Sequence, residues 1–320
     1  YALLFRMQAV WELYLYLGLL TGIGLAAHDV TTLSTIARWF VRRRGLMSGF
    51  TKAGGGVGQV VVPTVMAALI AGPGWRIACL LFGITAIVVL VGTAQMLRRS
   101  PAALGLKPDG EAPDPSPNRA QQEVGASFRE AFRSRTIWLL GIAKFCDLFC
   151  LFTVIVHIVP FGVDHGLHPA MAAGVLSTIG AMSIAGRLLL GGAYDRFGAR
   201  RSLLACFSLL TASLVWLQFA DTTWSLFLFA AVYGPAHGGF FTITSPSVAE
   251  YFGTRAHGTL FGLVISCGTF GATLGPIVAG SLFDMWGSYT IAFALLLGFS
   301  LAGLAVASML PRPVQAPAAG

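Results

Sequence analysis

Residues 186–201 read GRLLLGGAYDRFGARR and stand between two long apolar runs. A glycine pair and one acidic residue end the first run, three arginines follow, and the second run begins at Ser202. In membrane proteins, lysine and arginine concentrate in the short connections that face the cytoplasm. The stretch therefore predicts a cytoplasmic turn between two transmembrane helices.

The composition of the whole chain indicates a polytopic membrane protein. Of the 320 residues, 56% are hydrophobic and 11% are charged, whereas soluble proteins carry roughly 25% charged residues. So few charges could not cover the surface of a soluble fold. The five cysteines lie inside apolar runs without a CxxC pattern, so we interpret them as small buried hydrophobic residues.

Apolar runs and charged connections alternate along the chain. A bilayer is crossed by ~20 helical residues, and nine runs are long enough: approximately 10–37, 46–71, 75–97, 136–161, 170–193, 202–220, 224–249, 258–283 and 288–310. Most lysines and arginines fall in the segments 38–45, 98–135, 194–201, 250–257 and 311–320. The positive-inside rule places these segments in the cytoplasm. The net charge of +8 therefore follows from topology, and we do not expect nucleic-acid binding.

The proline-rich segment 98–135 divides the chain. Its prolines exclude a continuous helix and it has little to bury, so it is typical of a linker. We expect residues 1–97 to be the remainder of a first bundle. Residues 136–310 would then form a six-helix second bundle, and 311–320 a disordered tail.

An internal repeat relates the two parts. At an offset of 213 residues, identical residues recur as Arg42 and Arg255, Gly45 and Gly258, Gly49 and Gly262, Gly55 and Gly268, Gly58 and Gly271, and Pro63 and Pro276. Such duplication is common in secondary transporters. The second part has three spans with no counterpart in the first. We therefore expect the chain to hold nine of twelve helices, with three preceding Tyr1.

The opening stretch resembles the signature loop of the major facilitator superfamily. The matching residues are Gly191, Asp195, Arg196, Gly198, Arg200 and Arg201. Four further segments resemble the monocarboxylate transporter and oxalate/formate antiporter branch: RWFVRRRGL at 38–46, GWR at 74–76, HIVP at 157–160 and GSLFDMWGSY at 280–289. The resemblance implies an all-α membrane carrier of two pseudo-symmetric six-helix bundles that close alternately over a central site. It also implies a multi-pass plasma-membrane protein with a cytoplasmic linker and C-terminus, and transport of small carboxylates by proton symport or exchange.

The signature loop is interpreted as a gate. Asp195 is placed within reach of bases in the turn and of helix N-termini, both of which favour an anion. These contacts would hold the bundles together in the outward-facing state. The alternative is a turn that only satisfies helix ends. Glu250 is interpreted as a helix-end cap.

Charged residues inside the predicted spans require an explanation, because inserting each of them into the membrane costs ~2.5–3.5 kcal/mol. Arg187 precedes Asp195 by eight residues, which is about 12 Å of helix, and its forked donors suit a carboxylate. The matching arginine of monocarboxylate carriers is implicated in substrate binding. Those carriers hold an aspartate one turn earlier, where this chain has Ser183. The alternative is a structural charge.

Lys144 and Asp147 stand three residues apart, so their side chains can meet on one helix face. They form either a structural pair or a pair that substrate or a proton breaks, with Lys144 binding substrate and Asp147 carrying the proton. Lys52 is expected to snorkel to the cytoplasmic face.

Three further residues could serve substrate or protons. His157 and Asp29 are candidates for proton coupling, because histidine titrates near neutrality and a buried acid can be a proton site. A packing histidine, and an aspartate paired with an upstream helix, are the alternatives. His237 is a candidate for substrate binding.

The sequence shows no catalytic constellation, metal-spaced cluster or nucleotide loop. The glycine run at 54–58 lacks the ending of a phosphate loop, so we interpret it as close helix packing. We expect no enzyme activity, cofactor or metal. The function predicted is secondary transport of a small organic anion. An efflux carrier for a non-anionic molecule and a non-transporting membrane sensor remain alternatives.

Overall fold

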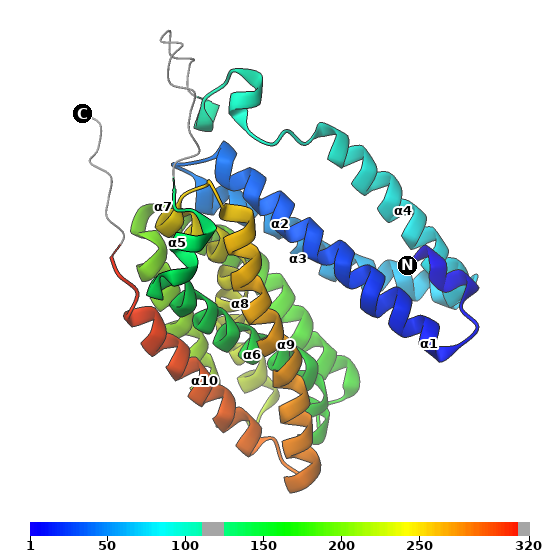
Figure 1. Ribbon diagram of the computed structural model, residues 1–320. Helices are drawn as coiled ribbons and strands as arrows, with labels where there is room; N and C mark the ends of the chain where they lie inside the picture. Colours follow the sequence, from blue (N-terminus) through cyan, green and yellow to red (C-terminus); the bar gives the residue numbers. More distant parts are fainter. Residues whose placement is uncertain (111–124, 313–320) are drawn as a thin grey trace.

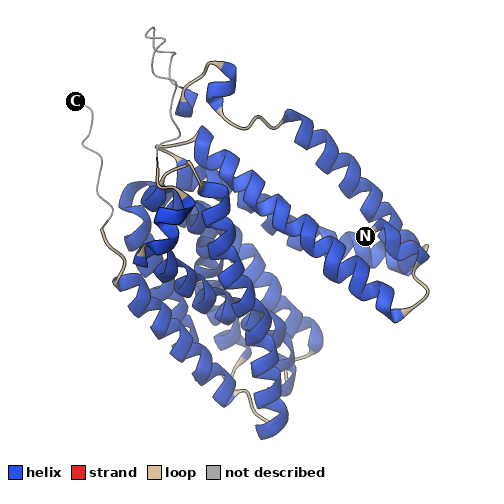
Figure 2. Cartoon of the chain, viewed as in Figure 1, coloured by secondary structure: helices blue, strands red, loops and turns tan. Residues whose placement is uncertain are grey.

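The computed structural model describes residues 1–110 and 125–312 (Figure 1). All regular elements in these ranges are helices (Figure 2), apart from one isolated bridge between Gly125 and Gly253. The all-α prediction is confirmed. The predicted tail from residue 313 and the middle of the linker, 111–124, lie outside the described residues.

The first group of helices comes from the N-terminal third of the chain. After η1 (Ala2–Arg6), the helices α1 (Val10–Leu13), η2 (Tyr14–Leu20) and α2 (Thr21–Trp39) follow one another without a break. The helices α3 (Arg44–Ala71) and α4 (Trp75–Met96) complete the group. These elements match the expected spans 10–37, 46–71 and 75–97.

The second group follows the linker, which contains η3 (Pro101–Leu104), η4 (Pro108–Gly110) and α5 (Phe128–Arg133). Its helices are α6 (Arg135–Asp164), α7 (Pro169–Leu217), α8 (Thr223–Phe252), α9 (His257–Trp286) and α10 (Thr290–Ser308). In Figure 1 the first group lies beside this bundle, and α3 packs on α7 and α8. Within the described residues, seven helices are long and apolar enough to cross a membrane, and the 49-residue α7 is counted as one of them.

The predicted loop at 194–201 is wrong in one respect, because helix continues through nearly all of it. Spans 170–193 and 202–220 are both part of α7, and the helical path breaks only at Gly198. Gly198 has φ 77° and ψ 178°, a conformation that glycine adopts at little cost. A single residue therefore turns the chain where a longer turn was expected.

Helix boundaries follow the internal repeat. The helix α2 ends at Trp39 and α8 at Phe252, while α3 begins at Arg44 and α9 at His257. Both pairs are separated by 213 residues, the offset of the glycine and proline identities. The coincidence supports duplication of a helix–turn–helix unit. We call the end of the molecule that carries the turns at 40–43 and 253–256 and the break at Gly198 the basic end.

Glycines let α3 approach α7 closely. A Cβ atom at Gly49 would collide with the Arg187 carbonyl oxygen, and one at Gly191 would lie 2.6 Å from the Gly45 carbonyl oxygen. Gly56 lies against the Arg187 side chain, whereas Gly54 and Gly58 have open space beside them. Close packing therefore explains part of the glycine run and not all of it.

Replacing Gly49 by Val is expected to destabilise the fold by about 1–3 kcal/mol, because the α3 and α7 backbones must separate to admit the side chain. Unfolding of the purified chain in a dodecyl sulfate titration measures the effect. Gly54→Ala is the matched control, since it faces open space and favours the helix by about 1 kcal/mol. Equal unfolding midpoints for the two variants would contradict close α3–α7 packing.

Candidate functional site

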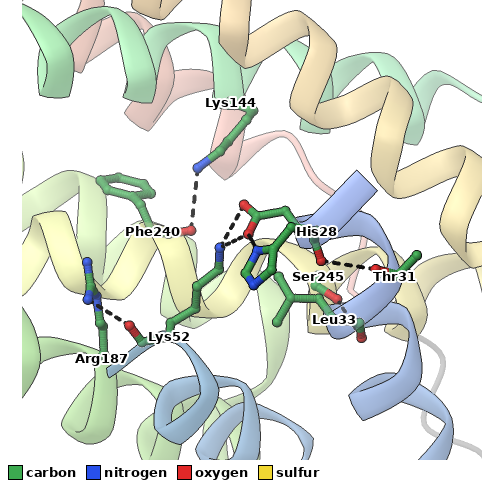
Figure 3. Close-up of polar contacts among 9 residues, drawn as sticks. His28, Thr31, Leu33, Lys52, Lys144, Arg187, Phe240 and Ser245 are labelled. Carbon is green, nitrogen blue, oxygen red and sulfur yellow. Dashed lines mark hydrogen bonds and ion pairs between the residues drawn. The ribbon is translucent and has the colours of Figure 1, made fainter. Parts of the chain in front are cut away.

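A cluster of charged side chains lies between the two groups of helices. It consists of Asp29 on α2, Lys52 on α3, Lys144 and Asp147 on α6, and Arg187 on α7. Figure 3 shows Lys52, Lys144 and Arg187 reaching toward the same region from three different helices. We refer to these five residues as the charged cluster.

Arg187 crosses from α7 to the first group of helices. Its side chain is 3% exposed, and Nη1 donates a hydrogen bond to the Lys52 carbonyl oxygen at 2.7 Å. Its buried Nε has no hydrogen-bond partner among the described residues. A buried guanidinium with donors left over is suited to binding an anion.

Lys144 and Asp147 form an ion pair within α6. The Lys144 Nζ lies 2.6 Å from Asp147 Oδ2, and the side chains are 4% and 1% exposed. The other oxygen, Asp147 Oδ1, is buried without a partner in the described part of the chain. Lys144 Nζ also lies 3.5 Å from the Phe240 carbonyl oxygen. The predicted meeting of the two side chains is present, and one acceptor is left unsatisfied.

Asp29 and Lys52 form a second ion pair, between α2 and α3. The Lys52 Nζ lies 2.7 Å from both carboxylate oxygens of Asp29. The expectation that Lys52 snorkels to the surface is therefore wrong, because a carboxylate on the neighbouring helix neutralises its charge in place. His28 Nδ1 also lies 3.4 Å from Asp29 Oδ1.

Phe241 lies at the centre of the charged cluster, although no sequence pattern predicts a role for it. Its ring centroid is 5.2 Å from Lys144 Nζ, 5.8 Å from Lys52 Nζ and 5.8 Å from the Arg187 guanidinium. Cations within about 6 Å of an aromatic face are attracted to its quadrupole. No local pattern marks Phe241, because the three cations come from three other helices.

The two histidine candidates differ in their surroundings. His237 is buried, its ring lies 5.2 Å from the Phe241 ring, and its Nδ1 has no partner among the described residues. His157 lies ten residues beyond Asp147, about 15 Å along α6. Its ring nitrogens contact the Tyr289 hydroxyl at 3.1 Å and the Pro276 carbonyl oxygen at 3.0 Å. His237 thus borders the charged cluster, whereas His157 joins α6 to α9 away from it.

The residues of the signature loop lie at the basic end, where Asp195 contacts the first group of helices. Asp195 accepts hydrogen bonds from the backbone N–H groups of Gly45 at 2.6 Å and Leu46 at 2.9 Å. These groups form the N-terminus of α3, where a carboxylate is stabilised. The contact joins α7 of the second group to α3 of the first, and it uses a helix N-terminus, one of the two partners expected for Asp195.

The arginines of the signature loop do not share the contact that Asp195 makes with the N-terminus of α3. Arg200 donates to the Ser308 carbonyl oxygen at 2.7 Å, at the end of α10, and Arg196 stacks on Phe197. Arg201 is exposed at the rim of a cavity at the basic end. The loop therefore fixes α10 as well as α3.

Glu250 is more than a helix-end cap for its own helix. It accepts a hydrogen bond from the Tyr194 hydroxyl and another, of 2.9 Å, from the Ala199 backbone N–H. Ala199 follows the break at Gly198, so Glu250 on α8 caps the second half of α7. A Cβ atom at Gly198 would also lie 3.0 Å from Glu250 Oε1. The cap and the break therefore depend on each other.

Comparison with known proteins places this architecture in a family. The family model "Major Facilitator Superfamily" matches residues 1–196 and 182–319. Monocarboxylate transporter 12 of Mus musculus is 27% identical over 91% of this chain, and monocarboxylate transporter 11 of Homo sapiens is 32% identical over 94%. The chain spans 64% of the length of each.

A solved structure shares the fold. The transporter FucP in its outward conformation superposes with a TM-score of 0.70 at 16% identity, covering 98% of this chain and 81% of its own. The superfamily consists of transporters and not of enzymes, and its members are multi-pass integral membrane proteins. The two matches to the family model, the likeness to monocarboxylate transporters and the shared helical fold show that this chain belongs to the Major Facilitator Superfamily.

Proposed function

We propose that this chain contributes to a secondary transporter that moves a small organic anion of the monocarboxylate type by alternating access. The observation that carries the proposal is the charge balance of the cluster around Phe241. Three cations and two carboxylates leave one positive charge. Because uncompensated charge inside a membrane is costly, an arriving monoanion would restore neutrality. A neutral substrate would leave that cost in place.

Arg187 would bind the carboxylate, with Lys144 and His237 beside it. Both lysines already have carboxylate partners, whereas the Arg187 Nε has none among the described residues. A planar guanidinium also matches a carboxylate with two parallel hydrogen bonds. A substrate bound there would lie within reach of the Phe241 ring.

Proton coupling would run through Asp147. Protonation of this carboxylate would release Lys144 from its ion pair and raise the positive charge of the cluster, which favours anion binding. Asp29 could act in the same way on Lys52. Exchange of one anion for another needs neither step, so pH dependence of binding separates symport from exchange.

The matched relatives support the substrate class, since both of those described above are named monocarboxylate transporters. The basic end, with its arginine-rich turns, would face the cytoplasm of a plasma-membrane protein. The Asp195 contact would close that end in the outward-facing state. If this end faces the cytoplasm, a membrane-impermeant maleimide should label the Met309→Cys variant only after the cells have been opened.

Pyruvate binding tests the proposal directly. Scintillation proximity with the purified chain in nanodiscs is expected to show binding of radiolabelled pyruvate and not of its neutral amide. Arg187→Gln should weaken pyruvate binding at least tenfold, and Arg187→Lys less, because an ammonium lacks the planar fork. Radiolabelled counterflow in proteoliposomes then distinguishes a transporter from a membrane sensor, which binds without exchange.

Arg76→Gln is the matched control. Arg76 stacks on Trp75 outside the charged cluster, so its loss should leave pyruvate binding within twofold of the original value. Unchanged binding in Arg187→Gln would remove the proposed role of Arg187. Equal binding of pyruvate and its amide would favour a carrier of non-anionic molecules.

A further inference from the structure

A cavity lies at the basic end, and none of the five residues of the charged cluster lines it. Its volume is about 630 Å³. Its walls are the turn between α2 and α3, the break of α7 around Gly198, the end of α8 at Glu250, and Arg312 after α10. The cavity therefore has one wall from the first group of helices and the others from the second.

The lining of this cavity is strongly basic. The arginines that border it are Arg42, Arg44, Arg196, Arg200, Arg201 and Arg312. Its carboxylates, Asp195 and Glu250, both accept hydrogen bonds from backbone N–H groups. Both carboxylates therefore bind helix ends, and among the described residues the arginines that border the cavity outnumber the carboxylates that border it.

Part of this basic charge is fixed in place by the fold. Arg44 donates to the carbonyl oxygens of Ala37 and Phe40, and Arg200 donates to that of Ser308. The Arg200 Nε is nevertheless buried without a partner among the described residues. These contacts hold guanidinium groups at the cavity wall before any ligand arrives. Preorganised donors of this kind lower the cost of binding.

Membrane topology alone does not account for the arrangement. The positive-inside rule requires basic residues near helix ends, and exposed arginines such as Arg129 and Arg133 on α5 satisfy it without bordering the cavity. It does not require arginines from separate segments to converge on one hollow. Convergence is what a ligand with several negative charges needs.

We propose that this cavity binds an anion that carries phosphate groups. Arginine forks bind phosphate oxygens in pairs, and several arginines suit a ligand with more than one negative charge. The volume lies within the roughly 300–1,000 Å³ of small-molecule sites, which leaves room for more than one phosphate group. A nucleoside phosphate and the head group of a phosphorylated lipid share this chemistry.

Such a ligand would stabilise the closed basic end. It would touch the α2–α3 turn and the α7 break together, and these are the segments that the Asp195 contact joins. Separation of the two groups of helices would divide the cavity and release the ligand. The site would thus bias the molecule toward the state in which Asp195 holds α3.

Binding to nanodiscs with two kinds of probe tests the proposal. In one arm, ATP is titrated onto the purified full chain in phosphatidylcholine nanodiscs, and binding is followed by thermophoresis. In the other, nanodiscs contain phosphatidylinositol 4,5-bisphosphate, and the retained lipid is counted by native mass spectrometry. Binding in the first arm identifies a soluble phosphate ligand, and retention in the second alone identifies a lipid head group.

Two double variants make the test specific. Arg201→Gln with Arg312→Gln removes two exposed charges from the cavity, and Arg129→Gln with Arg133→Gln removes two from α5. The cavity variant should bind at least tenfold more weakly in the arm that responds, and the α5 variant within twofold of the original. Both should unfold at the same dodecyl sulfate fraction as the original chain. Absence of binding in both arms, or equal losses in the two variants, would overturn the proposal. The assay measures binding without transport, so it stands apart from the anion-transport proposal.

Discussion

Replacing Lys144 by Met is expected to destabilise the protein by about 3–5 kcal/mol, the cost of leaving a buried charge without its partner. Asp147 is 1% exposed and Lys144 Nζ is its only hydrogen-bond partner among the described residues. The methionine would fill nearly the same space, so the loss would come from charge and not from a cavity. The free energy of unfolding of the purified chain in a dodecyl sulfate titration measures it.

The double variant Lys144→Met with Asp147→Leu separates charge from packing. Removing both members of a buried pair is often neutral or even stabilising, so the double variant should recover most of the lost stability. Arg129→Met on the surface is the control and should change stability by less than about 0.5 kcal/mol. A double variant as unstable as the single one would show that the pair is not an independent unit.

The same double variant decides what the pair is for. A protein that folds and still binds pyruvate with unchanged pH dependence would assign the pair a structural role only. A protein that folds but no longer responds to pH would assign proton coupling to Asp147. Because the fold is retained in both cases, stability does not confuse the interpretation.

Replacing Asp195 by Ala is expected to open the basic end. The carboxylate accepts two backbone hydrogen bonds at the N-terminus of α3, of 2.6 and 2.9 Å, and hydrogen bonds to charged groups contribute roughly 1.5–3 kcal/mol each. Water would replace part of this contribution in the open state. We expect the population of the open arrangement to rise at least tenfold, which corresponds to about 1.4 kcal/mol.

Spin labels at Val41 and Met309 measure this shift. Both side chains are exposed at the basic end, one in the α2–α3 turn and one after α10. Electron–electron distance distributions should gain a longer component in Asp195→Ala. Asp284→Ala, which removes an exposed carboxylate near the end of α9, should leave the distribution unchanged. An unchanged distribution in Asp195→Ala would show that the contact does not hold the two groups together.

Local sequence signals were sufficient for the helices and for the position of the signature loop. Apolar runs of membrane length located the helices of both groups, because backbone groups in lipid must be satisfied within each segment. Gly198 was selected only as part of the signature loop, and the structure shows that the break in the helix is confined to this residue. The anionic character of Asp195 indicated a helix N-terminus as partner, but nothing local identified that N-terminus as the one of α3.

The charged cluster, by contrast, could not be assembled from local sequence signals. Each of Arg187, Lys144 and Asp147 is a charge inside an apolar run, and the spacing of Lys144 and Asp147 predicted that these two would pair. The pairing of Lys52 with Asp29, and the three cations around Phe241, depend on side chains from five helices. Phe241 is one of 23 phenylalanines, and its neighbours within α8 do not distinguish it.

The sequence by itself determined the class of protein, the helices, the repeat and the residues whose charge demands an explanation. These properties depend on composition and on spacing within one segment, where the rise of a helix and the thickness of a bilayer set the scale. Only the tertiary structure decided that Asp29 pairs with Lys52, which ring the cations surround and which helix end Asp195 caps. Those contacts join residues as far apart as Lys52 and Phe241, 189 positions along the chain, and their geometry follows from how glycine-lined helices pack together.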